Sequence, residues 1–188
     1  LLAGNIDSRG GVLGDGSITL VSGATLNVDG TVRSGANSIG ATAANDVVRS
    51  GAGQLISSDS VAVTARNGDI GSVALPIQID APVVSLKTDN LGAIQARDVF
   101  GTLANTTGLT LTAGNGFNVT SNTALASLSA TTLGTGAGAL AITSPGQSFG
   151  LVRNGTAVDL TGTTSGTALN ALTVNVSAGS ARILGAQA

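Results

Sequence analysis

Short apolar-x-apolar pairs recur along this chain, and polar corners rich in Gly, Asn and Ser separate them. Residues 108–122, GLTLTAGNGFNVTSN, show the form: Leu109 and Leu111 alternate with threonines, a Gly-Asn-Gly corner follows, and Phe117 and Val119 resume the alternation. Strict alternation directs one set of side chains inward and the other outward, as in a β-strand. Gly and Asn tolerate the positive φ angles that tight corners need. The pattern therefore predicts very short strands joined by tight corners.

The same form returns along the sequence, which indicates a repeat architecture. Val61, Val84 and Leu109 occupy equivalent positions 23 and 25 residues apart. Past Leu109 we expect the next equivalents at Leu140 and Leu172, after 31 and 32 residues, intervals that leave room for two shorter turns each. Strands this short must pack on neighbouring turns at about 4.8 Å. At roughly 20 to 25 residues per turn, we expect an all-β solenoid of about eight or nine turns.

The inward positions of such a solenoid form its core. A charge at Leu111 is expected to be the most damaging, because it would lie unpaired within the stack. A β-sandwich also has many short strands, but its strands are usually longer, and a chain with three Phe suits a narrow stacked core better. The residues that we expect to face inward are Val61, Val63, Ile70, Val84, Leu86, Ile94, Leu109, Leu111, Phe117 and Val119.

Composition supports a β protein. Charged residues make up 10% of the chain, against about 25% in an average domain, Glu is absent, and Lys87 is the only lysine. The polar positions are mostly Ser, Thr and Asn, and Thr and Val favour strands. Mean hydropathy is +0.40, yet no stretch approaches the roughly 18 consecutive apolar residues of a spanning helix, so we expect no transmembrane segment. A net charge of −2 with scattered arginines argues against binding nucleic acid.

Residues 60–99, SVAVTARNGDIGSVALPIQIDAPVVSLKTDNLGAIQARDV, carry a more specific run. A strand is followed by NG-x-IG, a Pro-Ile step and a further strand, formed here by Asn67-Gly68-Asp69-Ile70-Gly71 and Pro76-Ile77. In these residues the chain resembles the repeat region of filamentous-haemagglutinin-like exoproteins, bacterial adhesins exported by two-partner secretion. The resemblance implies a right-handed parallel β-helix that serves as a surface stalk or adhesive fibre outside the cell.

The same resemblance frames the expected organisation and partners. We expect residues 1–188 to form a single solenoid segment of a longer repetitive exoprotein. The NPNG or NPNL signatures of the family's secretion domain are missing, since no Asn-Pro occurs, which indicates internal stalk. The expected partners are neighbouring repeats of the same chain or fibre, and host or matrix carbohydrate or protein. The expected role is attachment, or cohesion of a matrix or biofilm.

The inventory of reactive residues predicts a non-enzymatic protein without a cofactor. The chain has no His, Cys or Tyr, so the usual general base and the soft metal ligands are missing. Asp69, Asp80, Asp89 and Asp98 follow one another at intervals of 11, 9 and 9 residues, and they are the candidates for calcium binding if they converge on adjacent turns. Paired carboxylates are also the minimum for glycosidic cleavage. Aspartates beside Gly or Asn are more commonly turn residues.

Two alternative functions stay open at this stage. One is a β-helix that binds or processes polysaccharide. The other is an ice-binding solenoid, which needs Thr-x-Thr on one face of every turn; Thr110 and Thr112 qualify, but the equivalent pairs read Ala62/Thr64 and Ser85/Lys87. N-glycosylation is open as well at the four sequons that begin at Asn105, Asn118, Asn154 and Asn175.

Overall fold

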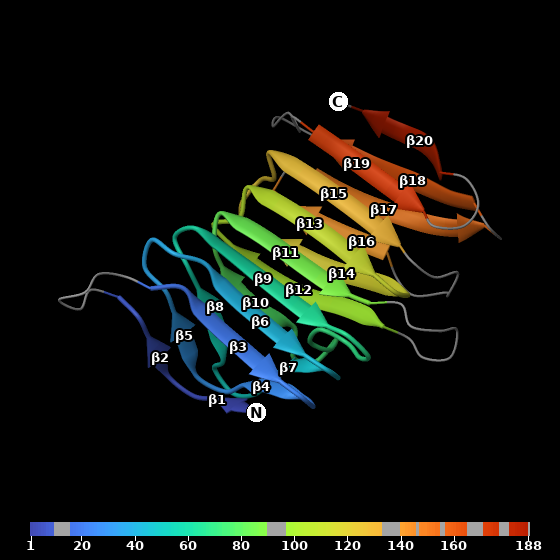
Figure 1. Cartoon of the computed structure of the whole chain (residues 1–188). Helices are drawn as coiled ribbons and strands as arrows, with labels where there is room; N and C mark the ends of the chain where they lie inside the picture. Colours follow the sequence, from blue (N-terminus) through green and yellow to red (C-terminus); the bar gives the residue numbers. More distant parts are fainter. Residues whose placement is uncertain are drawn as a thin grey trace.

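The computed structural model describes residues 1–9, 16–89, 97–132, 140–145, 147–154, 157–164, 171–176 and 181–187. All the regular structure in these residues is β-strand, as the sequence predicts. Two long sheets lie face to face, and along most of the described chain each turn passes from one sheet to the other (Figure 1). The protein is a β-solenoid, and none of its described residues forms a helix long and apolar enough to cross a membrane.

One wall is a seven-stranded parallel sheet that receives one strand from each turn. Its strands are β3 (Ile18–Ser22), β6 (Ile39–Ala43), β9 (Ser60–Ala65), β11 (Val83–Thr88), β13 (Gly108–Ala113), β15 (Ser127–Thr132) and β19 (Ala171–Val176). From β3 to β15, each strand of this sheet pairs with the strand that the following turn adds to the same sheet, which makes five uninterrupted circuits.

The opposite wall is a ten-stranded sheet that adjoins a three-stranded one. The three short strands are β1 (Leu2–Ala3), β4 (Leu26–Val28) and β7 (Val47–Arg49). Ile70 continues their row, because it bridges Val47 and Val99. The ten strands, in spatial order, are β2 (Ile6–Asp7), β5 (Thr31–Arg33), β8 (Gln54–Ile56), β10 (Ile77–Asp80), β12 (Asp98–Ala104), β14 (Gly116–Ser121), β16 (Leu140–Ser144), β17 (Gln147–Asn154), β18 (Ala157–Thr164) and β20 (Ala181–Gln187).

The predicted repeat register is confirmed from β9 to β13. Val84 lies opposite Val61 on one side and Leu109 on the other. All the predicted core residues that the structure describes are buried, at 2% exposure or less; Ile94 lies outside the described residues. Each turn therefore stacks its apolar side chains on those of the turns beside it, and the core is a continuous column between the sheets.

The expected eight or nine turns are too many. Beyond Leu109 the equivalent position is Leu128, not Leu140, and Leu172 follows Leu128. Leu140 belongs to the opposite wall, where it pairs with Phe117. A pair such as Leu140-x-Ile142 alternates in the same way in either sheet, so alternation alone could not assign its wall.

Between β16 and β18 the chain no longer contributes one strand to each wall in turn. Strand β17 pairs antiparallel with both β16 and β18, and β20 then resumes parallel pairing on β18. The seven-stranded sheet meanwhile steps directly from β15 to β19. The expected eight or nine turns counted the residues of these antiparallel strands as further circuits of the solenoid.

Gln147, the first residue of β17, is held in place where the antiparallel pairing begins. Its side chain is 3% exposed, and its Nε2 donates to the carbonyl of Leu125 at 2.9 Å while its Oε1 accepts from the Leu125 N–H at 2.8 Å. The hydroxyl of Ser144 also donates to Oε1, at 2.6 Å. The amide thus satisfies two backbone groups that a further strand would otherwise pair.

Candidate binding groove

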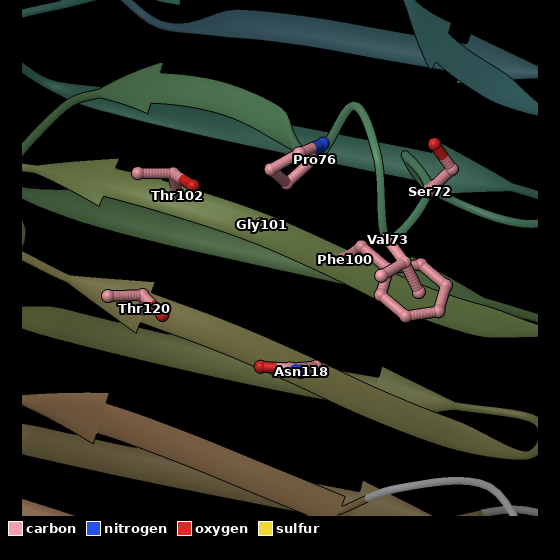
Figure 2. A pocket seen from close by; sticks show the side chains of 8 residues that line it. All are labelled: Ser72, Val73, Pro76, Phe100, Gly101, Thr102, Asn118 and Thr120. Atoms are coloured by element: carbon pink, nitrogen blue, oxygen red, sulfur yellow. The ribbon is translucent and has the colours of Figure 1, made fainter.

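Two adjoining depressions mark the outer face of the ten-stranded sheet, and we call them together the groove. Their volumes are about 180 and 220 Å³, and Thr102 on β12 lines both. Strands β8, β10, β12 and β14 supply the floor, and the segment 72–76 rises at one end (Figure 2). The lining residues are Gln54, Ser72, Val73, Pro76, Gln78, Ile79, Asp80, Phe100, Gly101, Thr102, Leu103, Ala104, Asn118, Thr120 and Asn122.

The floor of the groove is a column of polar side chains at one register position. Gln78 lies opposite Thr102, and Thr102 lies opposite Thr120. They point outward because the alternate residues of the same strands, such as Ile79 and Val119, are buried in the core. Within the described part of the chain, the side chains of Gln78, Thr102, Asn118 and Thr120 make no hydrogen bond to protein, so they are available to a ligand.

The segment that walls the groove follows the Asn67–Gly71 run noted in the sequence. Gly71 has φ +68°, and a Cβ there would lie 2.5 Å from the Phe100 carbonyl oxygen, so no other residue fits without strain. Ser72 N–H donates to the Leu75 carbonyl at 3.1 Å, and Leu75 N–H donates to the Ser72 hydroxyl at 3.0 Å. These bonds close residues 72–75 into a tight turn.

The turn holds an apolar group at one end of the groove. Val73 is 79% exposed and lines the depression together with Pro76 and Phe100. Figure 2 shows Val73 and Pro76 on this segment, and Asn118, Thr120 and Thr102 on the outer face of the strands that run beside it. The groove therefore combines an apolar corner with an amide and hydroxyl floor.

A column of aspartates lies at the corner that leaves the seven-stranded sheet. Asp69 N–H donates to Asp46 Oδ1 at 2.9 Å, and Asp98 N–H donates to Asp69 Oδ1 at 2.8 Å. Asn115 continues the column, because its Nδ2 donates to Asp98 Oδ1 at 2.9 Å. Each side chain thus binds the next turn, which explains why Gly68 must lack a side chain: a Cβ there would lie 2.0 Å from Asp46 Oδ1.

Stacking carboxylates in this way has an electrostatic consequence. Burial raises the pKa of Asp69 above its ordinary value of 3.8, and the negative charges of Asp98 and Asp46 add to the rise, while the hydrogen bond from Asp98 N–H opposes it. The column of aspartates therefore joins successive turns by hydrogen bonds, but it also brings negative charges close together, which disfavours the ionised form of Asp69.

The four calcium candidates do not gather in one place. Asp69 and Asp98 both belong to the column of aspartates, but Asp80 lies in the groove, where its Oδ1 accepts a hydrogen bond from Asn105 Nδ2 at 2.8 Å. Asp89 pairs with Lys87 Nζ at 2.8 Å. In the part of the chain that the structure describes, no three acidic side chains lie close enough to hold a metal ion.

The outer face of the seven-stranded sheet carries the Thr-x-Thr positions. Thr110 aligns with Ser85, and Thr112 aligns with Lys87, as the sequence predicts. The charged Lys87 therefore interrupts the threonine column, which weakens the case for an ice-binding face.

Comparison with known protein families, with curated proteins and with solved structures finds no match to this chain.

Sequence reasoning missed the groove. Gln78, Thr102 and Thr120 looked like ordinary outward residues, because their alignment becomes visible only once the turns are in register. The signal that was available is the segment from Gly71 to Pro76, which is longer than the segments that join β4 to β5 and β7 to β8 on the same wall, and which ends on a Pro.

Proposed function

We propose that this chain is a structural, non-enzymatic segment of a bacterial surface adhesin, and that it serves as a stiff stalk. The observation that carries the proposal is the unbroken stack of five circuits from β3 to β15, in which each circuit adds one parallel strand to the seven-stranded sheet. Such a body gains length by adding turns and needs no large central core. The resemblance of residues 60–99 to filamentous-haemagglutinin-like repeats supports the same role.

The distribution of acidic groups favours a structural role over polysaccharide cleavage. In the part of the chain that the structure describes, Asp80 is the one carboxylate that lines the groove, whereas most glycosidases place two carboxyl groups beside the scissile bond. Asp80 also accepts a hydrogen bond from Asn105 Nδ2, so one of its oxygens already has a partner in the protein.

The stalk role can be tested on the surface of a cell. We would place the chain between a membrane anchor and a tip domain of known ligand, and compare it with the Leu111→Asp chain, whose core is disrupted. We expect the intact chain to hold the tip at one fixed height and to support attachment to ligand-coated beads, and the disrupted chain to give a broad distribution of heights. Equal height distributions would overturn the stalk, and cleavage of a polysaccharide by the purified chain would overturn the non-enzymatic assignment.

A further inference from the structure

We propose that the groove on the ten-stranded sheet binds a neutral polysaccharide, with the sugar chain lying along the solenoid axis across β8, β10, β12 and β14. This inference goes beyond the stalk role and does not depend on it, because a stalk requires no ligand on its side.

The floor of the groove offers the hydrogen-bonding groups that sugar hydroxyls need. Gln78, Thr102 and Thr120 repeat at one position of successive strands, which places an amide or hydroxyl at steps of about 4.8 Å. Hydroxyls and amides both donate and accept, so each matches a sugar hydroxyl in either orientation. Asn118 adds a second amide beside this column.

The apolar corner suits the carbon-bound hydrogens of a sugar ring. Phe100 is partly exposed, and with Val73 and Pro76 it forms an apolar surface at the end of the polar column. Binding sites for small molecules commonly combine such a surface with a few polar groups that fix orientation. A ring that packs here removes apolar surface from water, while its hydroxyls reach Asn118 and Thr120.

Charge distinguishes a neutral sugar from an acidic one. None of the described residues that line the groove is Lys or Arg, and the one carboxylate among them, Asp80, is negative and bonded to Asn105. A uronate or sulfate group would find no positive partner and would lie near a like charge. The groove therefore selects against anionic polysaccharides.

The groove is formed before any ligand arrives. Its floor is held by the inter-strand pairing of β10, β12 and β14, and its wall by the two hydrogen bonds between Ser72 and Leu75. Little conformational entropy remains to be lost on binding, which favours affinity.

The test is a binding titration of the whole chain with soluble polysaccharides. The neutral probes are laminarin, galactomannan and hydroxyethyl cellulose, and the acidic probes are polygalacturonate and heparin. We expect at least one neutral probe to bind and both acidic probes to fail. We expect Phe100→Ala and the double variant Thr102→Ala/Asn118→Ala each to weaken that binding at least tenfold.

The matched control is Thr110→Ala, an exposed threonine on the other wall, which should bind as the parent does. Thermal melting of every variant separates a lost contact from a lost fold, and the double variant keeps the test valid if Phe100→Ala unfolds. Absence of binding to all neutral probes, binding of heparin or polygalacturonate alone, or equal binding by folded groove variants would each overturn the proposal. None of these results would bear on the stalk, because tip height is measured without a sugar.

Discussion

At the scale of single residues, Asp69 shows how one side chain joins two turns at an electrostatic cost. Its Oδ1 accepts the N–H of Asp98, and its own N–H donates to Asp46. Because burial raises its pKa above 3.8 in the folded protein, the native state holds a proton to higher pH than the unfolded state does. Between 3.8 and the raised value, the free energy of unfolding therefore falls as pH rises.

We predict that Asp69→Asn raises the melting temperature at pH 7. The asparagine oxygen can still accept the Asp98 N–H, while the half-buried charge and its repulsion from Asp46 and Asp98 disappear. The gain should shrink as pH falls below 3.8, where the wild-type carboxyl is neutral in both states. Melting curves across this range check the prediction, with Asp59→Asn, an exposed aspartate, as the control for net charge; a gain that is independent of pH would contradict it.

A second prediction concerns the core column. Leu111 is 0% exposed and lies between Leu86 and Ala130 of the adjacent turns. Leu111→Asp should cost more than about 4 kcal/mol, since it buries an unpaired charge. Thr110→Asp on the outer face of the same strand should cost about 1 kcal/mol or less, the difference in strand preference between the two residues. Urea unfolding followed by circular dichroism measures both, and a comparable loss in the two variants would show that this strand has no inner face.

At the scale of elements, the segment from Gly71 to Pro76 links the stack to the groove. Gly71 N–H donates to the Val47 carbonyl at 2.8 Å, and Phe100 N–H donates to the Ile70 carbonyl at 2.7 Å. The segment is thus anchored to the turns on both sides, which explains how an exposed loop can keep a fixed shape.

We predict that Gly71→Ala destabilises the protein by at least about 1–2 kcal/mol, the cost of a left-handed conformation for a residue with a Cβ, with the contact on the Phe100 carbonyl in addition. Gly40→Ala is the matched control, because a Cβ at Gly40 meets nothing within 4 Å, and it should be neutral or stabilising. Chemical denaturation of the two variants measures the difference, and equal stabilities would contradict the strained geometry.

The elements also show what the sequence does and does not determine. Inward positions from Val61 to Val119 were predictable, because large apolar residues alternate there with polar ones. Leu128 was overlooked because its alternating partner is the small Ala130. The antiparallel strands β17 and β18 were missed as well, although Asn154-Gly155 between alternating residues is a known hairpin signal. The groove needs side chains from four strands to align, and that alignment depends on corner lengths, which no local pattern encodes.

At the scale of the whole molecule, the two long sheets contain different numbers of strands. The ten-stranded sheet contains β17 and β18, for which the seven-stranded sheet has no counterparts among the described residues. At about 4.8 Å per strand, these two strands displace the walls by roughly 10 Å relative to each other. The regular part of the solenoid is therefore the five circuits before β16.

The modular stack predicts that one complete turn can be removed. Deleting residues 39–60 brings Val61 to the place of Ile39 above Ile18, since these positions share one register. We expect a folded protein with one cooperative transition and a denaturant slope lower by about a tenth to a fifth, because less surface is buried. Deleting residues 39–49, about half a turn, should abolish folding. Urea melts of both chains check this, and equal behaviour would contradict stacking by whole turns.

The direction of the hydrogen bonds decides how this body responds to tension. Its strands run across the long axis (Figure 1), so the bonds that join one turn to the next lie along that axis. A force that pulls the two ends apart therefore breaks the hydrogen bonds between turns one row at a time. It does not have to break all the bonds of a sheet at once. Each freed turn of 23 residues releases roughly 80 Å of chain. The protein would lengthen in steps under load while its remaining turns stay folded.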